Sequence, residues 1–150
     1  MNLNLVDFSW WHVTKAHQID KEAFNATAWS LKTFWNELSQ QNRYYLALVD
    51  ENKEIVGFGG IAFNGSDADI QTMVIKPEFQ KKGFGKKLLD ALLEKIKENS
   101  VNRVFLEVVA DNKPAISLYL SRKFTQIAKR SNYYPNGSDA VIMQLDLRAR

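Results

Sequence analysis

The stretch Gln80-Lys81-Lys82-Gly83-Phe84-Gly85-Lys86-Lys87 lies between a predicted strand, residues 68–75, and the clearest helical pattern of the chain. That helix is indicated by an apolar stripe of Leu88, Leu89, Leu92, Leu93 and Ile96. Free backbone N–H groups at a helix start, and the positive end of the helix dipole, favour an anion such as phosphate. The glycines allow the backbone to approach a ligand closely, and the lysines on both sides add positive charge. The stretch therefore predicts a phosphate-binding loop.

Two familiar phosphate-binding motifs do not fit this loop. A P-loop needs a glycine five residues before its Gly-Lys pair and a Ser or Thr after it, where this chain has Gln80 and Lys87. A dinucleotide-binding fingerprint needs a small residue three positions after Gly85, where this chain has Leu88. The loop alone leaves another interpretation open, in which the glycines serve a tight turn and the lysines a solvated helix face.

Outward from the loop, the pattern predicts strands and helices along the whole chain. The predicted elements are a strand 3–8, a helix 10–24, a helix capped by Ser30 and ending near Leu38, strands 44–49, 55–63 and 68–75, the helix after the glycine loop, a strand 103–109, a helix opened by Asn112 and reaching Arg122, and strands 124–129 and 140–147. This order predicts one mixed α/β domain over residues 1–150. The strand 103–109 has few polar positions, as expected when both faces of a strand are covered.

Composition narrows the class of protein. With 150 residues, 45% of them hydrophobic and 25% charged, the chain has the balance of an ordinary globular domain. It has no cysteine, and His12 and His17 have no cluster of ligand types near them, so we expect neither a disulfide, a cysteine nucleophile nor a metal site. The chain shows no signal-peptide pattern and no apolar run long enough to span a membrane, so we expect a cytoplasmic protein. The formal net charge of +3 suits an anionic ligand as well as a nucleic acid.

Two residues are candidates for proton transfer. Alternation along strand 103–109 places Phe105, Glu107 and Val109 on one face. A carboxylate in a covered strand is costly unless it is paired or used, and burial generally makes a carboxylate a stronger base, which suits a general base. Tyr119 lies on the next helix among apolar neighbours, so we expect its ring to be at least partly buried. Both residues also fit an ordinary core, the carboxylate held by backbone groups or a lysine and the phenol hydroxyl by water.

Residues 68–130 resemble the core of the GNAT acetyltransferases, and residues 80–85 match the family's pyrophosphate motif, Gln/Arg-x-x-Gly-x-Gly/Ala. Over most of the chain the resemblance extends to the RimI-type subfamily, bacterial enzymes that acetylate the N-terminal alanine of a small-subunit ribosomal protein. The segments that carry this closer resemblance are Ala28-Trp29-Ser30, Leu106-Glu107-Val108, Asn112, Ala115-Ile116, Leu118-Tyr119, Phe124, Asn132-Tyr133-Tyr134-Pro135 and Asp139-Ala140. The chain departs from the family pattern at Ala28, where proline is usual, and in its lysines, where the loop is usually richer in arginine.

The resemblance implies a fold, a cosubstrate and a set of site residues. The implied fold is a mixed, mostly antiparallel twisted sheet, splayed at its centre and flanked by helices on both faces. Acetyl-CoA would lie in the splay, between residues 68–75 and the strand that carries Glu107. The residues implied to bind it are Met73, Val74 and Ile75 through backbone groups, Lys81, Lys82, Gly83, Phe84, Gly85 and Lys86 around the pyrophosphate, and Asn112. Glu107 matches the family's general base and Tyr119 its general acid.

The amine substrate implied by the resemblance is the N-terminus of a protein, in this subfamily a small-subunit ribosomal protein. An α-amine is mostly protonated at neutral pH and must lose a proton before it attacks, which a general base can accept. Tyr133 and Tyr134 would cover the peptide, although the same loop also fits an ordinary hairpin. Two other functions stay open: acetylation of a lysine side chain or a small amine, and a non-catalytic module for acyl-CoA or RNA. We expect no direct contact with nucleic acid and none with a membrane.

Overall fold

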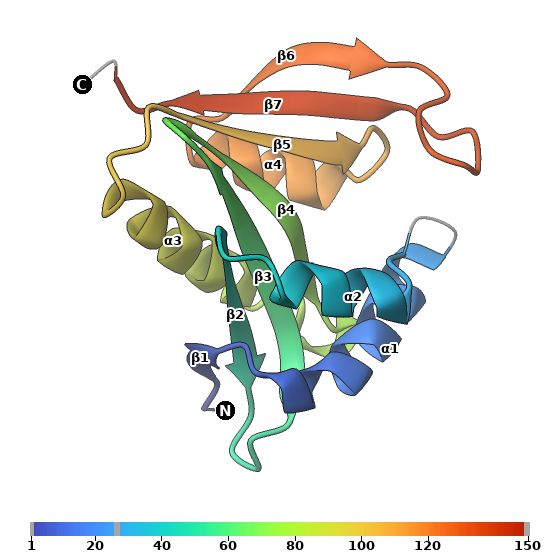
Figure 1. Ribbon diagram of the computed structural model, residues 1–150. Helices are drawn as coiled ribbons and strands as arrows, with labels where there is room; N and C mark the ends of the chain where they lie inside the picture. The colour runs from blue at the N-terminus through green and yellow to red at the C-terminus, as the bar shows by residue number, and fades with distance from the viewer. Residues whose placement is uncertain (1, 26–27, 149–150) are drawn as a thin grey trace.

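The computed structural model describes residues 2–25 and 28–148, and a seven-stranded sheet in the order β1-β2-β3-β4-β5-β7-β6 runs through this part of the chain (Figure 1). Its strands are β1 (Asn4–Asp7), β2 (Arg43–Val49), β3 (Ile55–Asn64), β4 (Asp67–Ile75), β5 (Arg103–Val109), β6 (Thr125–Arg130) and β7 (Ala140–Asp146). Neighbouring strands are antiparallel except β4 and β5, which are parallel. The predicted order of strands and helices is confirmed, and the sheet is mixed and mostly antiparallel as expected.

Helices cover both faces of the sheet. They are η1 (Trp10–His12), α1 (Val13–Phe24), α2 (Leu31–Leu38), η3 (Pro77–Phe79), α3 (Phe84–Lys97) and α4 (Lys113–Ser121). The helices α1 and α2 lie on one face and α3 and α4 on the other (Figure 1). Two predicted caps are formed: Ser30 Oγ accepts the N–H of Thr33 at 3.1 Å, and Asn112 Oδ1 accepts the N–H of Ala115 at 3.3 Å. Within the described ranges, no helix is long and apolar enough to cross a membrane.

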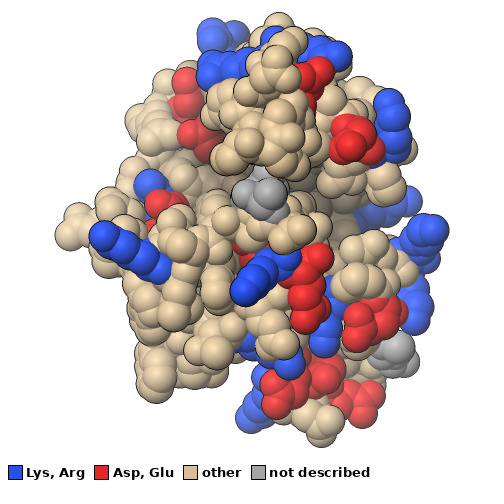
Figure 2. Space-filling model, turned by 90° about the vertical axis from the view of Figure 1, so that its right-hand side faces the viewer, with Lys and Arg blue, Asp and Glu red and all other residues tan. Residues whose placement is uncertain are grey.

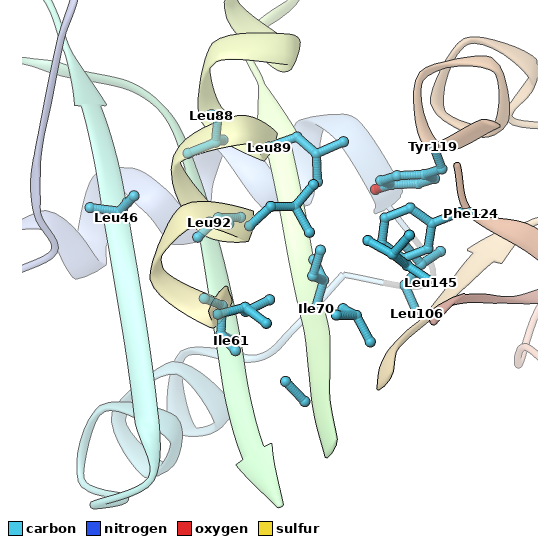
Figure 3. Packing of buried hydrophobic residues seen from close by; sticks show 14 of the residues in the cluster. Leu46, Ile61, Ile70, Leu88, Leu89, Leu92, Leu106, Tyr119, Phe124 and Leu145 are labelled. Carbon is cyan, nitrogen blue, oxygen red and sulfur yellow. The ribbon is translucent and has the colours of Figure 1, made fainter. Parts of the chain in front are cut away.

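Each face of the sheet has its own hydrophobic core. The predicted leucine stripe of α3 packs onto one face, and Figure 3 shows Leu88, Leu89 and Leu92 among the buried side chains between α3 and the strands. Tyr119 and Phe124 continue this core, with their ring centroids 5.8 Å apart. On the other face, Val13 of α1 and Phe34 of α2 pack around Phe58 of β3. Each such large apolar side chain contributes about 1.5–3 kcal/mol when fully buried, so the two cores hold the sheet from both sides.

The strands β4 and β5 separate part-way along their length. Their parallel pairing ends at Ile70 in β4 and Leu106 in β5. At the same place, a bulge interrupts the pairing of β3 with β4 and leaves Gln71 without a partner in β3. Beyond it, in the described chain, residues 72–75 pair only with β3 and residues 107–109 only with β7. The sheet is therefore splayed at its centre, as the resemblance implied.

The expectation that both faces of β5 are covered is wrong. Val104 and Leu106 are buried on the α3 side of the sheet, whereas on the opposite side Phe105 is half-buried and Glu107 is exposed. The physical reason is the splay: α1 packs against β3 and β4, so the same face of β5 borders a cleft instead of a helix. The apolar run along β5 reflects one buried face and a second face that lines a cavity.

Candidate active site

Where β4 and β5 separate, two adjoining cavities form one cleft. The first, of about 460 Å³, includes Asp20, Asp69 and Glu107 in its lining, and we call it the carboxylate cavity. The second, of about 740 Å³, lies against Gly83 and Gly85, and we call it the glycine-loop cavity. The residues that line both are Phe24, Met73, Val109, Asn112 and Ala115. Figure 2 views the molecule from the side of the β6–β7 loop and shows the surface hollowed below that loop.

The glycine loop has the backbone geometry that its sequence predicts. Gly83 is the N-cap of α3, with a φ of 87° in the left-handed region that favours glycine. A Cβ added at Gly83 would meet no atom within 4 Å, so this residue faces open space at the start of the helix. Because glycine has no side chain to cap the helix, the N–H groups of the first turn of α3 are left for a ligand. This arrangement fits an anionic group such as a pyrophosphate.

The lysines around the loop are not equivalent. Lys81 and Lys86 line the glycine-loop cavity, whereas Lys82 does not. Lys87 is held elsewhere, because its Nζ donates a hydrogen bond to the backbone carbonyl of Leu3 at 2.9 Å. The expectation that all the lysines around the loop add charge for an anion is therefore too broad. Lys81 and Lys86 are the ones that face the cavity, and Lys87 instead ties α3 to the N-terminal segment.

The free edge of β4 forms one wall of the cleft. Met73, Val74 and Ile75 line the glycine-loop cavity, and their partners in the sheet are in β3. One backbone group is already occupied, because Gln80 Nε2 donates a hydrogen bond to the carbonyl of Ile75 at 2.8 Å. Asn112, the cap of α4, lines both cavities from the β5 side. The predicted binding residues that line neither cavity are Lys82, which is exposed, and Phe84, which packs against the core.

The carboxylate cavity holds both candidates for proton transfer. Glu107 lines it from β5, and its exposure shows that the expected burial of this carboxylate was wrong. Tyr119 lines it from α4 and is only 7% exposed, so the expected burial of its ring is confirmed. Burial raises the pKa of Tyr119 to about 12, so the hydroxyl keeps its proton at neutral pH. The cavity therefore combines a proton acceptor with a proton donor.

The β6–β7 loop brings two tyrosines to the same place. Hydrogen bonding to Glu107 and the negative charge of that carboxylate raise the pKa of Tyr133. Burial, and then the charge of Glu107, raise the pKa of Tyr134, which lines the carboxylate cavity. The two tyrosine rings pack edge to face, with centroids 5.1 Å apart. The loop singled out in the sequence therefore lies beside the candidate base.

Two further carboxylates line this cavity. Asp20 of α1 is 2% exposed, and burial raises its pKa to about 6. Asp69 of β4 accepts a hydrogen bond from Asn64 Nδ2 at 2.7 Å, and burial raises its pKa as well. Among the described residues, no Lys, Arg or His lines the carboxylate cavity. The described lining therefore carries acidic and no basic side chains, which favours a cationic ligand such as a protonated amine.

The cleft thus has an anion-binding end, an acid–base end and a free strand edge between them. Residues 9–124 match the model of the acetyltransferase (GNAT) family. The chain belongs to this family. As a GNAT enzyme, it is an acetyl-CoA-dependent N-acetyltransferase.

Known relatives of this GNAT enzyme cover nearly all of its length. It is 33% identical over 135 residues to the Escherichia coli (strain K12) ribosomal protein bS18-alanine N-acetyltransferase, which amounts to 88% of this chain and 89% of that protein. A protein of the same name from Haemophilus influenzae is 34% identical over 133 residues, 86% of this chain and 88% of that protein. The resemblance to the RimI-type subfamily is therefore confirmed.

Solved structures confirm the GNAT fold. The crystal structure of the Escherichia coli ribosomal-protein-S18-alanine N-acetyltransferase matches with a TM-score of 0.87, over 97% of this chain and 94% of that one, at 28% identity. Arabidopsis thaliana NAA60 in complex with acetyl-CoA matches with a TM-score of 0.86, over 99% of this chain and 100% of that one. At 18% identity, this second match shows the fold alone.

Sequence reasoning missed two residues of this GNAT site, Asp20 and Asp69. A signal for Asp20 was present, because Val13, Ala16 and Asp20 follow the helical period on the buried side of α1. Asp69 gives no comparable signal, since it alternates with buried residues as any outward-facing strand position does. In residues 2–25 and 28–148, no group of three or more His, Cys, Asp or Glu residues gathers closely enough to hold a metal ion.

Proposed function

We propose that this GNAT enzyme transfers an acetyl group from acetyl-CoA to the N-terminal α-amino group of a protein, the N-terminal alanine of ribosomal protein bS18. The observation that carries this proposal is the 33% identity, over 88% of the chain, to the Escherichia coli enzyme named for that reaction. The chain would act as a single domain in the cytoplasm, where its ribosomal substrate is made. The acidic lining of the carboxylate cavity supports a cationic amine as the substrate.

The glycine-loop cavity would bind the cosubstrate. Acetyl-CoA supplies an acetyl group that is activated as a thioester. Lys81, Lys86 and the first turn of α3 would hold its pyrophosphate, since all of them border this cavity. The free edge of β4 offers backbone groups to the rest of the molecule, and Asn112 lies where the two cavities meet. The thioester would then lie close to the carboxylate cavity.

Glu107 and Tyr119 would carry the proton transfers. Glu107, directly or through water, accepts a proton from the α-ammonium, which leaves a neutral amine able to attack the thioester carbonyl. As the new C–N bond forms and the C–S bond breaks, Tyr119 donates its proton to the departing sulfur. The second proton that the nitrogen loses on becoming an amide passes to the Tyr119 phenolate, directly or through water, which restores the phenol. Tyr119 is protonated at neutral pH and so has a proton to donate, although its raised pKa also makes it a weaker acid. Both side chains border one cavity, so both can face the same substrate.

The amine would enter under the β6–β7 loop. Tyr134 lines the carboxylate cavity, and Tyr133 interacts with Glu107, so the loop would cover the amine and its first residue. Trp29 lines the cavity from the segment before α2 and would form the facing wall. These contacts support a substrate that presents a chain end to the cavity, although a lysine side chain also carries a primary amine.

Mass spectrometry on matched peptides tests the acceptor. One peptide has a free N-terminal alanine and blocked lysines, and the other has the same sequence with a blocked N-terminus and free lysines. We expect one acetyl group to appear on the first peptide only. Acetyl on the lysines of the second peptide would establish a lysine acetyltransferase instead. If neither peptide reacts, a small amine such as a polyamine becomes the leading candidate, and a failure with all three would favour a non-catalytic binding module.

A further inference from the structure

A buried carboxylate of α1 has no part in the proton transfers proposed above. Asp20 is 2% exposed and lies on the same side of α1 as Val13 and Ala16, which are fully buried. A charge in such a place is costly unless a partner compensates for its lost hydration. An apolar residue would satisfy the packing of this helix face without that cost. The burial of this carboxylate therefore requires a specific compensating interaction.

Asp20 has a hydrogen-bond partner in the backbone just before α2. The N–H of Trp29 donates a hydrogen bond to Asp20 Oδ2 at 2.7 Å, across nine positions of the chain. Hydrogen bonds to an ionised group are stronger than those between neutral groups. The next residue, Ser30, is the N-cap of α2, so this bond fixes the start of α2 relative to α1.

Trp29 carries this constraint into the active-site cleft. Its ring packs against Phe34 and Tyr45, at centroid distances of 5.2 and 6.4 Å. Trp29 and Asp20 both line the carboxylate cavity, together with Glu107. Neither lines the glycine-loop cavity, among the residues that the structure describes. The bond between them therefore shapes one end of the cleft and leaves the other end untouched.

We propose that Asp20 is a positioning residue for the amine substrate: by holding the N–H of Trp29, it fixes the wall of the carboxylate cavity against which the amine binds. This inference rests on the proposed function, because it takes the carboxylate cavity as the place where the amine enters. It gives Asp20 no role in binding acetyl-CoA. It also predicts that the hydrogen-bond acceptor at position 20 matters more than the negative charge.

Two variants of similar side-chain shape separate these effects. Asp20→Asn keeps an oxygen that can accept the N–H of Trp29, whereas Asp20→Leu keeps the branched shape, with larger methyl groups in place of the oxygens, and removes the acceptor. We expect Asp20→Leu to raise the KM for the amine by about tenfold to a hundredfold, and Asp20→Asn by about threefold or less. The KM for acetyl-CoA should stay within about twofold in both. Asp90→Asn and Asp90→Leu are matched controls, since Asp90 is an exposed residue of α3 that pairs with Arg122 outside both cavities.

Hydrogen exchange gives a direct check of the bond. The amide of Trp29 should lose protection in Asp20→Leu and keep most of it in Asp20→Asn. Two results would overturn the proposal in favour of a general structural role. One is an equal KM for the amine in the two variants, and the other is an equal rise in the KM for the amine and the KM for acetyl-CoA. The kinetic assay uses whichever amine the wild-type enzyme acetylates. If that amine is a lysine or a small amine, the proposed function is refuted, but the same assay still tests the role of Asp20. If no amine is acetylated, unchanged protection of the Trp29 amide in Asp20→Leu overturns the inference and its loss supports the bond.

Discussion

The two ends of the cleft are built in different ways. At the glycine-loop end, the groups proposed to bind the cosubstrate lie mainly in the stretch 80–86 and along the free edge of β4, while α1, α4 and the β6–β7 loop complete the lining of the cavity. The carboxylate end is assembled from α1, β4, β5, α4 and the β6–β7 loop, and its functional groups are side chains. The groups proposed to bind the cosubstrate therefore depend mostly on local backbone geometry, whereas the groups proposed to bind the amine depend on tertiary packing. Each end should therefore respond to its own set of substitutions.

The largest expected effect comes from Glu107→Gln. The amide cannot accept the proton of the amine, so kcat should fall by about 100- to 10,000-fold. The Kd for acetyl-CoA, measured by calorimetry, should not change, because Glu107 does not line the glycine-loop cavity. Asp69→Asn is the matched control, since it removes a different carboxylate from the same cavity and should have a smaller effect on kcat. Wild-type turnover in Glu107→Gln would reject its role as the base.

A pH series should show that the carboxylate end lowers stability near neutral pH. Burial raises the pKa of Asp20 from 3.8 to about 6. Between these values the folded chain holds a proton on Asp20 that the unfolded chain has lost. The contribution of Asp20 to the free energy of unfolding is therefore fully present below about pH 4, and about 3 kcal/mol is lost as the pH rises through about 6. Urea denaturation of the wild type and Asp20→Asn across this range measures it, and parallel pH curves for the two proteins would contradict it.

Tyr119→Phe should have an intermediate effect at the same end. It removes one hydroxyl and keeps the ring packed on Phe124, so the melting temperature should change little. We expect kcat to fall by about tenfold to a hundredfold, less than for Glu107→Gln, because a thiol with a pKa of about 8.5 leaves readily even without full protonation. Tyr44→Phe is the control for loss of a phenol outside the cleft, since Tyr44 lines neither cavity. An unchanged kcat in Tyr119→Phe would remove Tyr119 from the mechanism.

The smallest expected effect tests the glycine-loop end. Replacing Lys81 and Lys86 together by alanine should raise the KM for acetyl-CoA by about tenfold, which corresponds to about 1.4 kcal/mol. Lys82→Ala should change this KM by about twofold or less, because Lys82 does not line the cavity. The amine KM should not respond to either change. Steady-state kinetics with each substrate varied in turn measures these values. An effect of Lys82→Ala as large per lysine as that of the double variant would show that only the total charge of the loop matters.

The contrast between the two ends also explains what the sequence could predict. The caps at Ser30 and Asn112, the leucine stripe of α3 and the glycine loop depend on neighbours a few positions away, so the sequence pattern predicted all of them. The splay of the sheet did not come from periodicity, because the bulge at Gln71 depends on how β3 and β4 pair. It was expected only from the family resemblance.

The errors also arose where distant elements meet. Glu107 was expected to be buried because β5 is apolar. Its exposure depends instead on whether a helix covers that face of β5, and the face borders a cleft. Lys87 was expected to serve the loop, but its partner, the carbonyl of Leu3, is far away in the sequence. Asp20 was overlooked although it interrupts an apolar helix face. A charged residue on an apolar helix face can be recognised in the sequence, and it indicates that a specific contact compensates for its burial.

The strands β4 and β5 stop pairing part-way along their length, and this feature also affects aggregation. Past Ile70 and Leu106, in the described chain, the two strands no longer pair with each other, and each presents a row of backbone N–H and C=O groups to the gap. At the outer border of a sheet, such rows invite pairing with a strand of another molecule. Here the rows face each other inside a cleft walled by α1 and the β6–β7 loop. The two unpaired strand edges thus lie inside a cleft, whose walls hinder pairing with a strand of another molecule.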